Sequence, residues 1–215
     1  GWDDYLEQGV MQAIDVALAI SGADRANTLG FCIGGTLLAS ALAVLAARGE
    51  DKAASLTLLT TMLDFSDTGE LGLMVSEQAV AAREASIGRG GLLKGRELAQ
   101  VFAALRANDL IWPYVVNGYL KGKAPPPFDL LFWNGDDTNL PGPMYCWYLR
   151  NTYLENKLKV PGATTVCGEK VDLGRITAPV FVYASREDHI VPWQAAYAST
   201  PLFKGKRKFV LGASG

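Results

Sequence analysis

The segment that decides the fold is Leu29-Gly30-Phe31-Cys32-Ile33-Gly34-Gly35, which contains the pattern G-x-C-x-G. The run Asn27-Thr28-Leu29 leads into it and predicts a buried strand, while the almost wholly apolar run 36–48 predicts a helix packed on nearly all sides. A cysteine between glycines at such a junction is typical of a nucleophile elbow, because glycines remove side chains that would collide at a sharp strand-to-helix turn. We expect Gly30 and Gly34 to be the elbow glycines.

The elbow pattern predicts a role for its central residue. Cys32 would lie at a helix N-terminus, where unsatisfied N–H groups favour a thiolate and are expected to lower the pKa of the thiol. The N–H of Ile33 would point to where an oxyanion forms during acyl transfer. The alternative is a structural cysteine buried in a glycine-rich turn.

The strands that follow predict a parallel sheet. Residues 55–61 form a second strand pattern, so strand, helix and strand make a βαβ unit. The next convincing strand pattern is 179–184, and the roughly one hundred residues in between far exceed the dozen that a plain crossover needs. Further patterns predict helices at 3–20, 72–85, 96–105, 145–154 and 193–202, and a last strand at 207–211.

These patterns divide the chain into three parts. Residues 1–63 are predicted to be the first part of an α/β core with the elbow, residues 64–176 a cap or lid inserted over the sheet, and residues 177–215 the second part of the core. The aromatic residues of the insertion, among them Trp133, Trp147 and Tyr148, are expected to make core or subunit contacts more often than substrate contacts.

Composition excludes several classes of function. The 215 residues include 20 Lys and Arg against 22 Asp and Glu, a net charge of −2, which argues against a nucleic-acid-binding protein. No apolar run approaches the ~18–20 residues of a membrane span. Three cysteines leave one unpaired, which disfavours a disulfide framework and suits a reducing cytosol. The single histidine, His189, has no cysteine cluster near it, so we expect no metal site.

The ends of the sequence also suggest an expectation. It begins at Gly1 without a methionine and stops in the loop-like run 212–215. We therefore expect an internal piece of a longer protein, which lacks the first strands of the sheet and its C-terminal end.

A second candidate catalytic group follows the strand pattern 179–184. In enzymes built around a nucleophile elbow, the catalytic acid and base come from loops later in the chain. Asp188 lies four residues past the strand, where it could orient a base. Glu187 is a local competitor, and an N-cap or a surface carboxylate is the alternative role. The adjacent His189 is not expected to be the base, because neighbouring side chains on an extended backbone point to opposite sides. It is expected to support the acid loop, and the base to follow residue 215.

The motifs together resemble the class I polyhydroxyalkanoate synthases, along essentially the whole chain. The segments that carry the resemblance are the lipase-like box 30–36 and the runs 58–65, 128–136, 139–150 and 185–193. The resemblance implies an α/β-hydrolase fold, with a mostly parallel sheet and a large cap insertion. In this family the run 211–215 is followed by the catalytic histidine, which agrees with a base beyond the given sequence.

The resemblance also implies an activity. Cys32 would take the acyl group from a short-chain (R)-3-hydroxyacyl-CoA, release coenzyme A, and pass the acyl group to the hydroxyl of another unit to build a polyester. Asp188 would orient the histidine or act on that hydroxyl. No cofactor is implied, since coenzyme A is a product. The expected protein is a cytoplasmic homodimer at the surface of polymer granules, and the 215-residue piece by itself is expected to be inactive.

Two other functions remain open from the sequence. A cysteine-dependent hydrolase of the dienelactone hydrolase or thioesterase type also uses a G-x-C-x-G elbow, although the long insertion speaks against a compact enzyme of that kind. A granule-surface or dimerisation partner without chemistry of its own is the non-enzymatic alternative.

Overall fold

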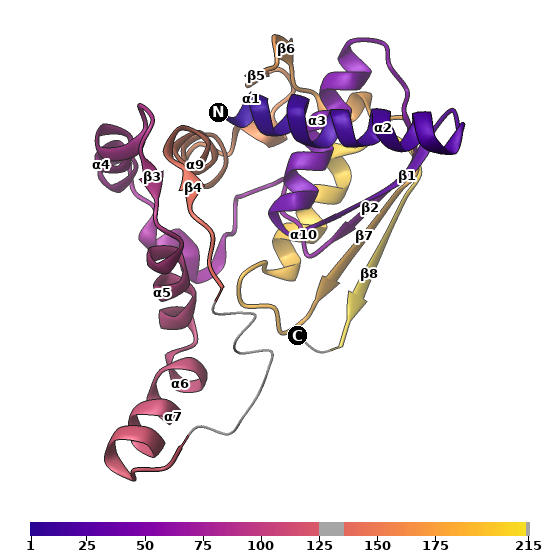
Figure 1. The fold of residues 1–215 in the computed structure, drawn as a ribbon. Coiled ribbons are helices and arrows are strands. Elements are labelled where there is room, and N and C mark those ends of the chain that lie inside the picture. The colour runs from indigo at the N-terminus through magenta and orange to yellow at the C-terminus, as the bar shows by residue number, and fades with distance from the viewer. Residues whose placement is uncertain (125–135, 214–215) are drawn as a thin grey trace. The chain divides into compact units, whose positions relative to one another are not determined.

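The computed structural model describes residues 1–124 and 136–213, and its centre is a four-stranded sheet in the order β1-β2-β7-β8 (Figure 1). Each neighbouring pair of strands is parallel. The predicted parallel α/β architecture is therefore confirmed. Residues 125–135 lie outside the described residues, and with them all of the family motif 128–136 except residue 136, including Trp133. The bounds of the strands are β1 (Ala26–Phe31), β2 (Ala53–Leu59), β7 (Val180–Ser185) and β8 (Arg207–Gly212).

Helix α3 (Ile33–Ala47) and helix α10 (Trp193–Ser199) cover one face of this sheet. Helix α3 packs on β1 and β2, and α10 packs on β7. The apolar run of α3 explains its place, because ten of its residues are buried. The buried positions of β2 and β7 alternate along each strand, as in Leu56 and Leu58, and form the other side of this core.

The opposite face of the sheet is more open to solvent. On β1 the side chains of Leu29 and Phe31 are 62% and 64% exposed, and the alternate positions of β2 and β7 are only partly buried. Parallel sheets are usually covered by helices on both faces, which explains why β1 is apolar on its exposed side as well.

The N-terminal helix predicted for residues 3–20 is confirmed. It runs without a break through α1 (Trp2–Asp4), η1 (Tyr5–Met11), which has π-helical hydrogen bonding, and α2 (Gln12–Ser21). Gly22 ends it in the left-handed conformation, with φ of 66° and its N–H donated to the carbonyl of Leu18. The η1 turn packs on α3 and buries Leu6.

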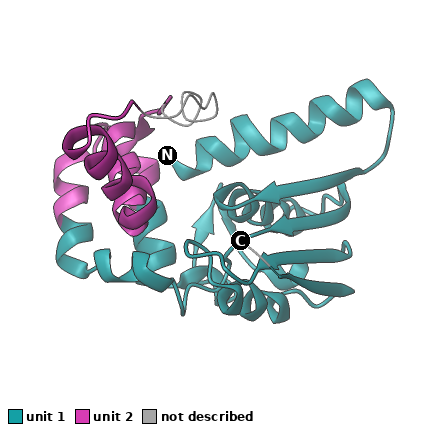
Figure 2. Cartoon of the chain, turned by 90° about the horizontal axis from the view of Figure 1, so that it is seen from below, with its two compact units in different colours: residues 1–81, 147–215 teal, residues 82–146 magenta. Residues whose placement is uncertain are grey.

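The chain forms two compact units, drawn in two colours in Figure 2. One comprises residues 1–81 and 147–215, and the other residues 82–146. The predicted insertion 64–176 contributes to both, and its outline as a separate cap stays a prediction. Besides the sheet and its helices, the first unit contains η2 (Gly69–Met74), η4 (Leu149–Leu154), η5 (Lys157–Lys159), β5 (Thr165–Val166), β6 (Glu169–Lys170), η6 (Leu173–Arg175) and η7 (Thr200–Leu202).

The second unit is mostly helical. Its helices confirm the helical patterns at 72–85, 96–105 and 145–154, of which the first and last extend into the first unit. An ion pair of 3.0 Å joins Arg83 to Glu97. Large apolar side chains between residues 110 and 120 are exposed, among them Trp112 and Tyr119. The elements are α4 (Glu77–Ile87), β3 (Leu92–Leu93), α5 (Gly95–Leu105), α6 (Ala107–Leu110), α7 (Trp112–Tyr114), η3 (Val115–Leu120), β4 (Leu140–Pro141) and α9 (Gly142–Tyr148).

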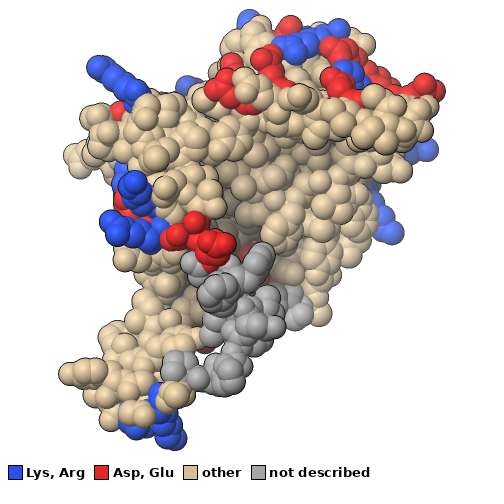
Figure 3. Space-filling model, viewed as in Figure 1, with Lys and Arg blue, Asp and Glu red and all other residues tan. Residues whose placement is uncertain are grey.

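Charges on the described residues are mixed in sign. In the view of Figure 3, acidic and basic side chains lie close to one another at the N-terminal helices. Within residues 1–124 and 136–213, no helix combines the length and the hydropathy that a bilayer span requires.

The buried hydroxyl of Ser199 gives a test of this packing. It accepts hydrogen bonds from the N–H groups of Leu63 and Asp64, at 2.9 and 3.0 Å, and donates to Ala195. Ser199→Ala leaves two N–H groups without this acceptor, so we expect the free energy of unfolding to fall by about 1–3 kcal/mol, measured by chemical denaturation.

Ser21→Ala is the matched control, because the Ser21 hydroxyl is exposed at the end of α2. We expect it to change stability by less than about 0.5 kcal/mol. Equal stability of the two variants would contradict the proposed role of Ser199.

Candidate active site

The candidate site is built around the bend between β1 and α3. Cys32 is the N-cap of α3 and has φ of 52° and ψ of −128°, a strained conformation for a residue with a side chain. Its N–H donates to Leu59 at 3.0 Å, and its carbonyl accepts from the N–H of Gly35 at 2.9 Å and the hydroxyl of Thr61 at 3.2 Å. These bonds on both sides of the residue hold it in the elbow conformation.

Two glycines allow the bend, and one of them differs from the prediction. A Cβ on Gly30 would lie 2.4 Å from the Cα of Gly35, and a Cβ on Gly35 would lie 2.1 Å from the hydroxyl of Thr61. A Cβ on Gly34 would meet nothing within 4 Å. The expectation that Gly34 relieves a collision is therefore wrong. The close approach occurs at Gly35, because the first turn of α3 brings that residue against β1 and Thr61.

The end of β2 forms the second side of the site. Thr60 has φ of 42° and donates its N–H to the carbonyl of Tyr183 at 2.8 Å. The chain thus turns out of the sheet after Leu59, two residues before the end of the predicted strand pattern 55–61. This turn presents Thr61 to the carbonyl of Cys32.

The pKa of Cys32 is raised above its ordinary value, contrary to the predicted lowering. Burial is the largest cause, and the negative charge of Asp188 adds to it. A hydrogen bond from the N–H of Ile33 acts in the predicted direction but is outweighed. The sequence showed the helix N-terminus but not the loss of solvent around the sulfur, which disfavours the charged thiolate.

Asp188 lies in the loop after β7, in the electrostatic range of Cys32. One of its carboxylate oxygens accepts the N–H groups of Ile190 and Val191, at 2.9 and 3.0 Å. These bonds fix the carboxylate and leave its second oxygen without a hydrogen bond to any described residue. Glu187 is exposed, whereas Asp188 is partly buried, so the geometry favours Asp188 as the acid of the site.

The structure brings Cys32, Ile33 and Asp188 together at the carboxyl ends of β1 and β7, the edge at which parallel α/β sheets bind ligands. Their catalytic roles stay predictions. His189 is partly buried, and its carbonyl lies near Gly69 at the start of η2. The base predicted after residue 215 stays a prediction too.

An aromatic cluster lies beside the elbow, and the sequence did not reveal its relation to the site. The ring of Tyr148 stacks on Trp2, with centroids 5.4 Å apart, and meets Phe65 and Tyr153 edge to face at 6.1 and 5.7 Å. Trp147 stacks on Trp2 as well, at 4.6 Å. The expected core role of Trp147 and Tyr148 agrees with these contacts. Burial raises the pKa of Tyr148 well above its usual value, and the charges of Tyr153 and Cys32 add to this rise.

A polar cluster holds the segment that follows β2. The carboxylate of Asp64 accepts from the N–H of Ser66 and from the amide of Asn156, at 2.9 and 2.8 Å. Burial raises the pKa of Asp64, but the hydrogen bonds from Ser66 and Asn156, with the charge of Lys159, outweigh it and leave the pKa lowered. The segment after β2 is thereby tied to Asn156 and to Lys159 of η5.

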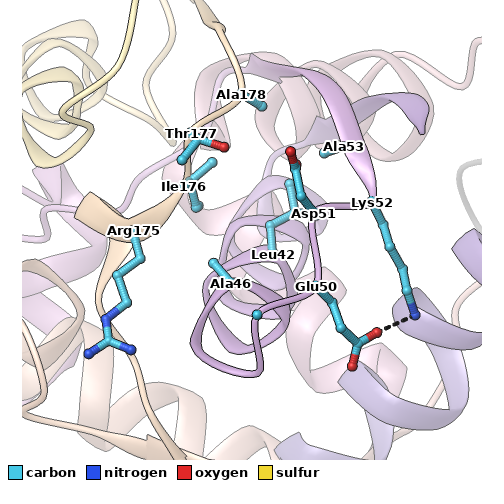
Figure 4. A pocket seen from close by; sticks show the side chains of 11 residues that line it. Leu42, Ala46, Glu50, Asp51, Lys52, Ala53, Arg175, Ile176, Thr177 and Ala178 are labelled. Carbon is cyan, nitrogen blue, oxygen red and sulfur yellow. Dashed lines mark ion pairs between the residues drawn. The ribbon is translucent and has the colours of Figure 1, made fainter. Parts of the chain in front are cut away.

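A separate cavity of about 240 Å³ lies at the other end of the sheet (Figure 4). Residues 49–53 ahead of β2, residues 175–178 ahead of β7, and Leu42 and Ala46 of α3 line it. In a parallel sheet these loops are at the amino ends of the strands, opposite Cys32. The charged side chains in the cavity are paired, as Lys52 is with Asp15 and Glu50, so we assign no catalytic role to it.

The other two cysteines differ from Cys32 in their surroundings. Cys146 is buried in α9. Cys167 stands with Gly168 in the turn between β5 and β6, where burial and the nearby carboxylates raise its pKa to about 12. All three are free thiols. In the part of the chain that the structure describes, no group of His, Cys, Asp and Glu side chains is arranged to hold a metal ion.

The fold agrees with the comparisons to known proteins. Residues 8–215 match the model of the alpha/beta hydrolase fold family. The chain belongs to the α/β-hydrolase family. Solved α/β hydrolases share its fold: the monoacylglycerol lipase of Paleococcus ferrophilus has a TM-score of 0.51 and 15% identity, with 96% of this chain and 66% of the lipase covered. A hydrolase from Agrobacterium vitis has a TM-score of 0.52 and 14% identity, with 100% and 60% covered.

Within this family the most similar curated relatives include polymerases. The chain is 64% identical over 219 residues to the poly(3-hydroxyalkanoate) polymerase subunit PhaC of Cupriavidus necator, and 42% identical over 214 residues to the PhaC subunit of Rhizobium meliloti. All of this chain is covered, but only 37% and 35% of those relatives. The resemblance predicted from the motifs is confirmed, and the chain spans little more than a third of the length of these relatives.

The two glycines after the elbow provide a matched pair of variants. Gly35→Ala places a methyl group against Thr61, so we expect a loss of about 1–3 kcal/mol in the free energy of unfolding. Gly34→Ala meets open space in a helix, where alanine is favoured over glycine, and should be neutral or stabilising by up to about 1 kcal/mol. Denaturation of both variants measures this, and a greater loss for Gly34→Ala would refute the assignment.

The raised pKa of Cys32 predicts how its reactivity depends on pH. In the 215-residue chain, the rate of alkylation of Cys32 by iodoacetamide should rise through a midpoint above that of an ordinary cysteine, because its pKa is raised and the thiolate is the reactive form. Cys167 should react only near pH 12. Mass spectrometry of each cysteine after timed alkylation gives both profiles. A midpoint for Cys32 near neutral pH would contradict the dominance of burial.

Proposed function

We propose that the protein containing this chain is a thiol-dependent acyltransferase, which polymerises short-chain (R)-3-hydroxyacyl-CoA into a polyester and releases coenzyme A. The observation that carries the proposal is the strained elbow that presents Cys32, with Asp188 in electrostatic range, in a chain 64% identical to a polymerase subunit. A cysteine suits a thioester donor, since transfer from one thiol to another is nearly isoenergetic.

The first step is acylation of Cys32. The sulfur attacks the thioester carbonyl, a carbon–sulfur bond to Cys32 forms, and the bond to coenzyme A breaks as its sulfur takes a proton. The oxyanion that forms would be stabilised by the N–H of Ile33, which already donates toward the sulfur. Because burial raises the pKa of Cys32, the thiol needs a base to remove its proton during the attack.

The second step forms the ester. The 3-hydroxyl oxygen of another unit attacks the acyl-cysteine carbonyl, its proton passes to a base, and the sulfur of Cys32 leaves as the thiol. Asp188 is held by two backbone N–H groups and has an oxygen left to orient a histidine or to accept the hydroxyl proton. Water must be excluded, since it would hydrolyse the acyl-cysteine.

The same proposal extends to assembly and location. We infer a homodimer at the surface of polymer granules in the cytoplasm, with no cofactor besides the coenzyme A of the substrate. The exposed apolar side chains of residues 110–120 support an interface of this kind, because large contiguous apolar surfaces mark sites of association. The hydrolase alternative is not favoured, because the relatives described above are named polymerases.

The test uses the full-length protein with 3-hydroxybutyryl-CoA. Cys32→Ala should reduce coenzyme A release by at least about a thousandfold and abolish polymer, because no covalent intermediate can form. Cys167→Ser is the matched control and should leave both unchanged, since the Cys167 thiol stays protonated at working pH.

Three results are informative. Release of coenzyme A together with polymer supports the proposal, and release with only free acid indicates a hydrolase. Polymer formed by Cys32→Ala would contradict the proposed role of Cys32 as the nucleophile.

A further inference from the structure

The hydroxyl of Thr61 lies beside the peptide group that joins Cys32 to Ile33. Its oxygen is 3.2 Å from the carbonyl oxygen of Cys32 and 3.0 Å from that of Leu59, and Thr61 is only 1% exposed. A threonine hydroxyl has one proton, so the two carbonyls share it in a three-centre hydrogen bond. Gly35 leaves room for this hydroxyl, because a Cβ there would lie 2.1 Å from it.

The peptide group between Cys32 and Ile33 is planar and trans, so its carbonyl and its N–H point in opposite directions. A contact that fixes the carbonyl oxygen of Cys32 therefore also fixes the direction of the Ile33 N–H. Three donors approach this oxygen: the N–H groups of Gly35 and Thr36, at 2.9 and 3.4 Å, and the hydroxyl of Thr61. The first two belong to α3 itself, whereas Thr61 follows β2 and holds the peptide group from outside the helix.

The N–H of Ile33 is the first of α3, where helix geometry leaves N–H groups without a carbonyl partner in the helix. It belongs to the residue directly after Cys32, which is where an oxyanion forms when the sulfur attacks a carbonyl. A hydrogen bond accepted by the carbonyl of a peptide group polarises that group and strengthens the hydrogen bond that its N–H donates. The hydroxyl of Thr61 thus both directs and strengthens this donor.

We propose that Thr61 is a positioning residue for the oxyanion donor: through the peptide group that Cys32 shares with Ile33, its hydroxyl fixes the N–H that stabilises the tetrahedral intermediate. The proposal rests on the proposed acyl transfer at Cys32. Removal of a whole oxyanion donor slows acyl transfer about a hundredfold to a thousandfold. Loss of Thr61 leaves the N–H in place but less well directed, so the expected effect is smaller, about tenfold.

Replacement of Thr61 by valine removes the hydroxyl with little effect on the fold. Valine has nearly the shape of threonine, and both carbonyls keep another donor. The carbonyl of Leu59 accepts the N–H of Cys32 at 3.0 Å, and the carbonyl of Cys32 accepts the N–H of Gly35. Because neither carbonyl is left without a partner, Thr61→Val should lower the unfolding temperature by no more than a few degrees.

The experiment compares two reactions of Cys32 in the full-length protein. Single-turnover release of coenzyme A from 3-hydroxybutyryl-CoA passes through an oxyanion, whereas alkylation by iodoacetamide displaces iodide from a saturated carbon and forms none. Thr61→Val should slow the release about tenfold and leave the alkylation rate, followed by mass spectrometry, within about twofold. Thr61→Ser keeps the hydroxyl and should stay within about threefold of the unmodified protein in both reactions.

Thr28→Val is the matched control. The hydroxyl of Thr28, which is 8% exposed on β1, donates to the carbonyl of Ser55 on β2 at 2.8 Å, so this variant also loses a buried hydroxyl between the two strands. Both rates should stay within about twofold. Unchanged release by Thr61→Val would overturn the proposal, and so would an equal fall in its alkylation rate, since the sulfur itself would then be displaced. Should Thr61→Val fail to fold, Thr61→Ala and Thr61→Ser give the same comparison, because they differ only in the hydroxyl.

Acetylation by p-nitrophenyl acetate separates this proposal from the proposed function. The sulfur of Cys32 attacks the ester carbonyl, a carbon–sulfur bond forms, p-nitrophenolate leaves, and the thiol proton passes to a base, again through an oxyanion. Thr61→Val should slow this acetylation about tenfold as well. If the unmodified protein releases no coenzyme A, the proposed function fails while acetylation still decides the role of Thr61. No acetylation of Cys32 in the unmodified protein would overturn both proposals.

Discussion

The close approach of two backbone segments at Gly30 and Gly35 is the constraint on which the site depends. It lets the chain reverse from β1 into α3 within a few residues, and this reversal forces Cys32 to a positive φ. The strain is sustained because the carbonyl and the N–H of Cys32 are both hydrogen-bonded, to Gly35, Thr61 and Leu59. Strained backbone of this kind persists only where the surroundings over-determine it, as they do here.

Separate parts of the chain each hold one residue of the site around this bend. The loop after β7 holds the carboxylate of Asp188 by its own N–H groups, and the turn after β2 supplies Thr61. The result is a thiol that is more buried and less acidic than a helix N-terminus alone would make it. Such a thiol depends on an accompanying base for its reactivity.

Much of this arrangement could be predicted from the sequence, because the deciding patterns are local. The G-x-C-x-G run and the apolar period of α3 identify the bend, and the alternation in β7 places Asp188. The distinction between Gly34 and Gly35 could not be predicted, since it depends on which Cβ faces Thr61 after folding. Nor could the desolvation of Cys32 be predicted, because it depends on how the folded chain excludes solvent from the sulfur.

The uncovered face of the sheet has a practical consequence. Leu29 and Phe31 place two large apolar side chains on the same face of β1, on the side where the alternate residues of β2 and β7 are only partly buried. Molecules that carry such a face tend to stick to one another or to recruit chaperones, and the tendency grows with concentration. The 215-residue chain by itself is therefore expected to stay monomeric more readily in dilute samples, or with polar residues in place of Leu29 and Phe31. Both side chains lie on the solvent side of β1.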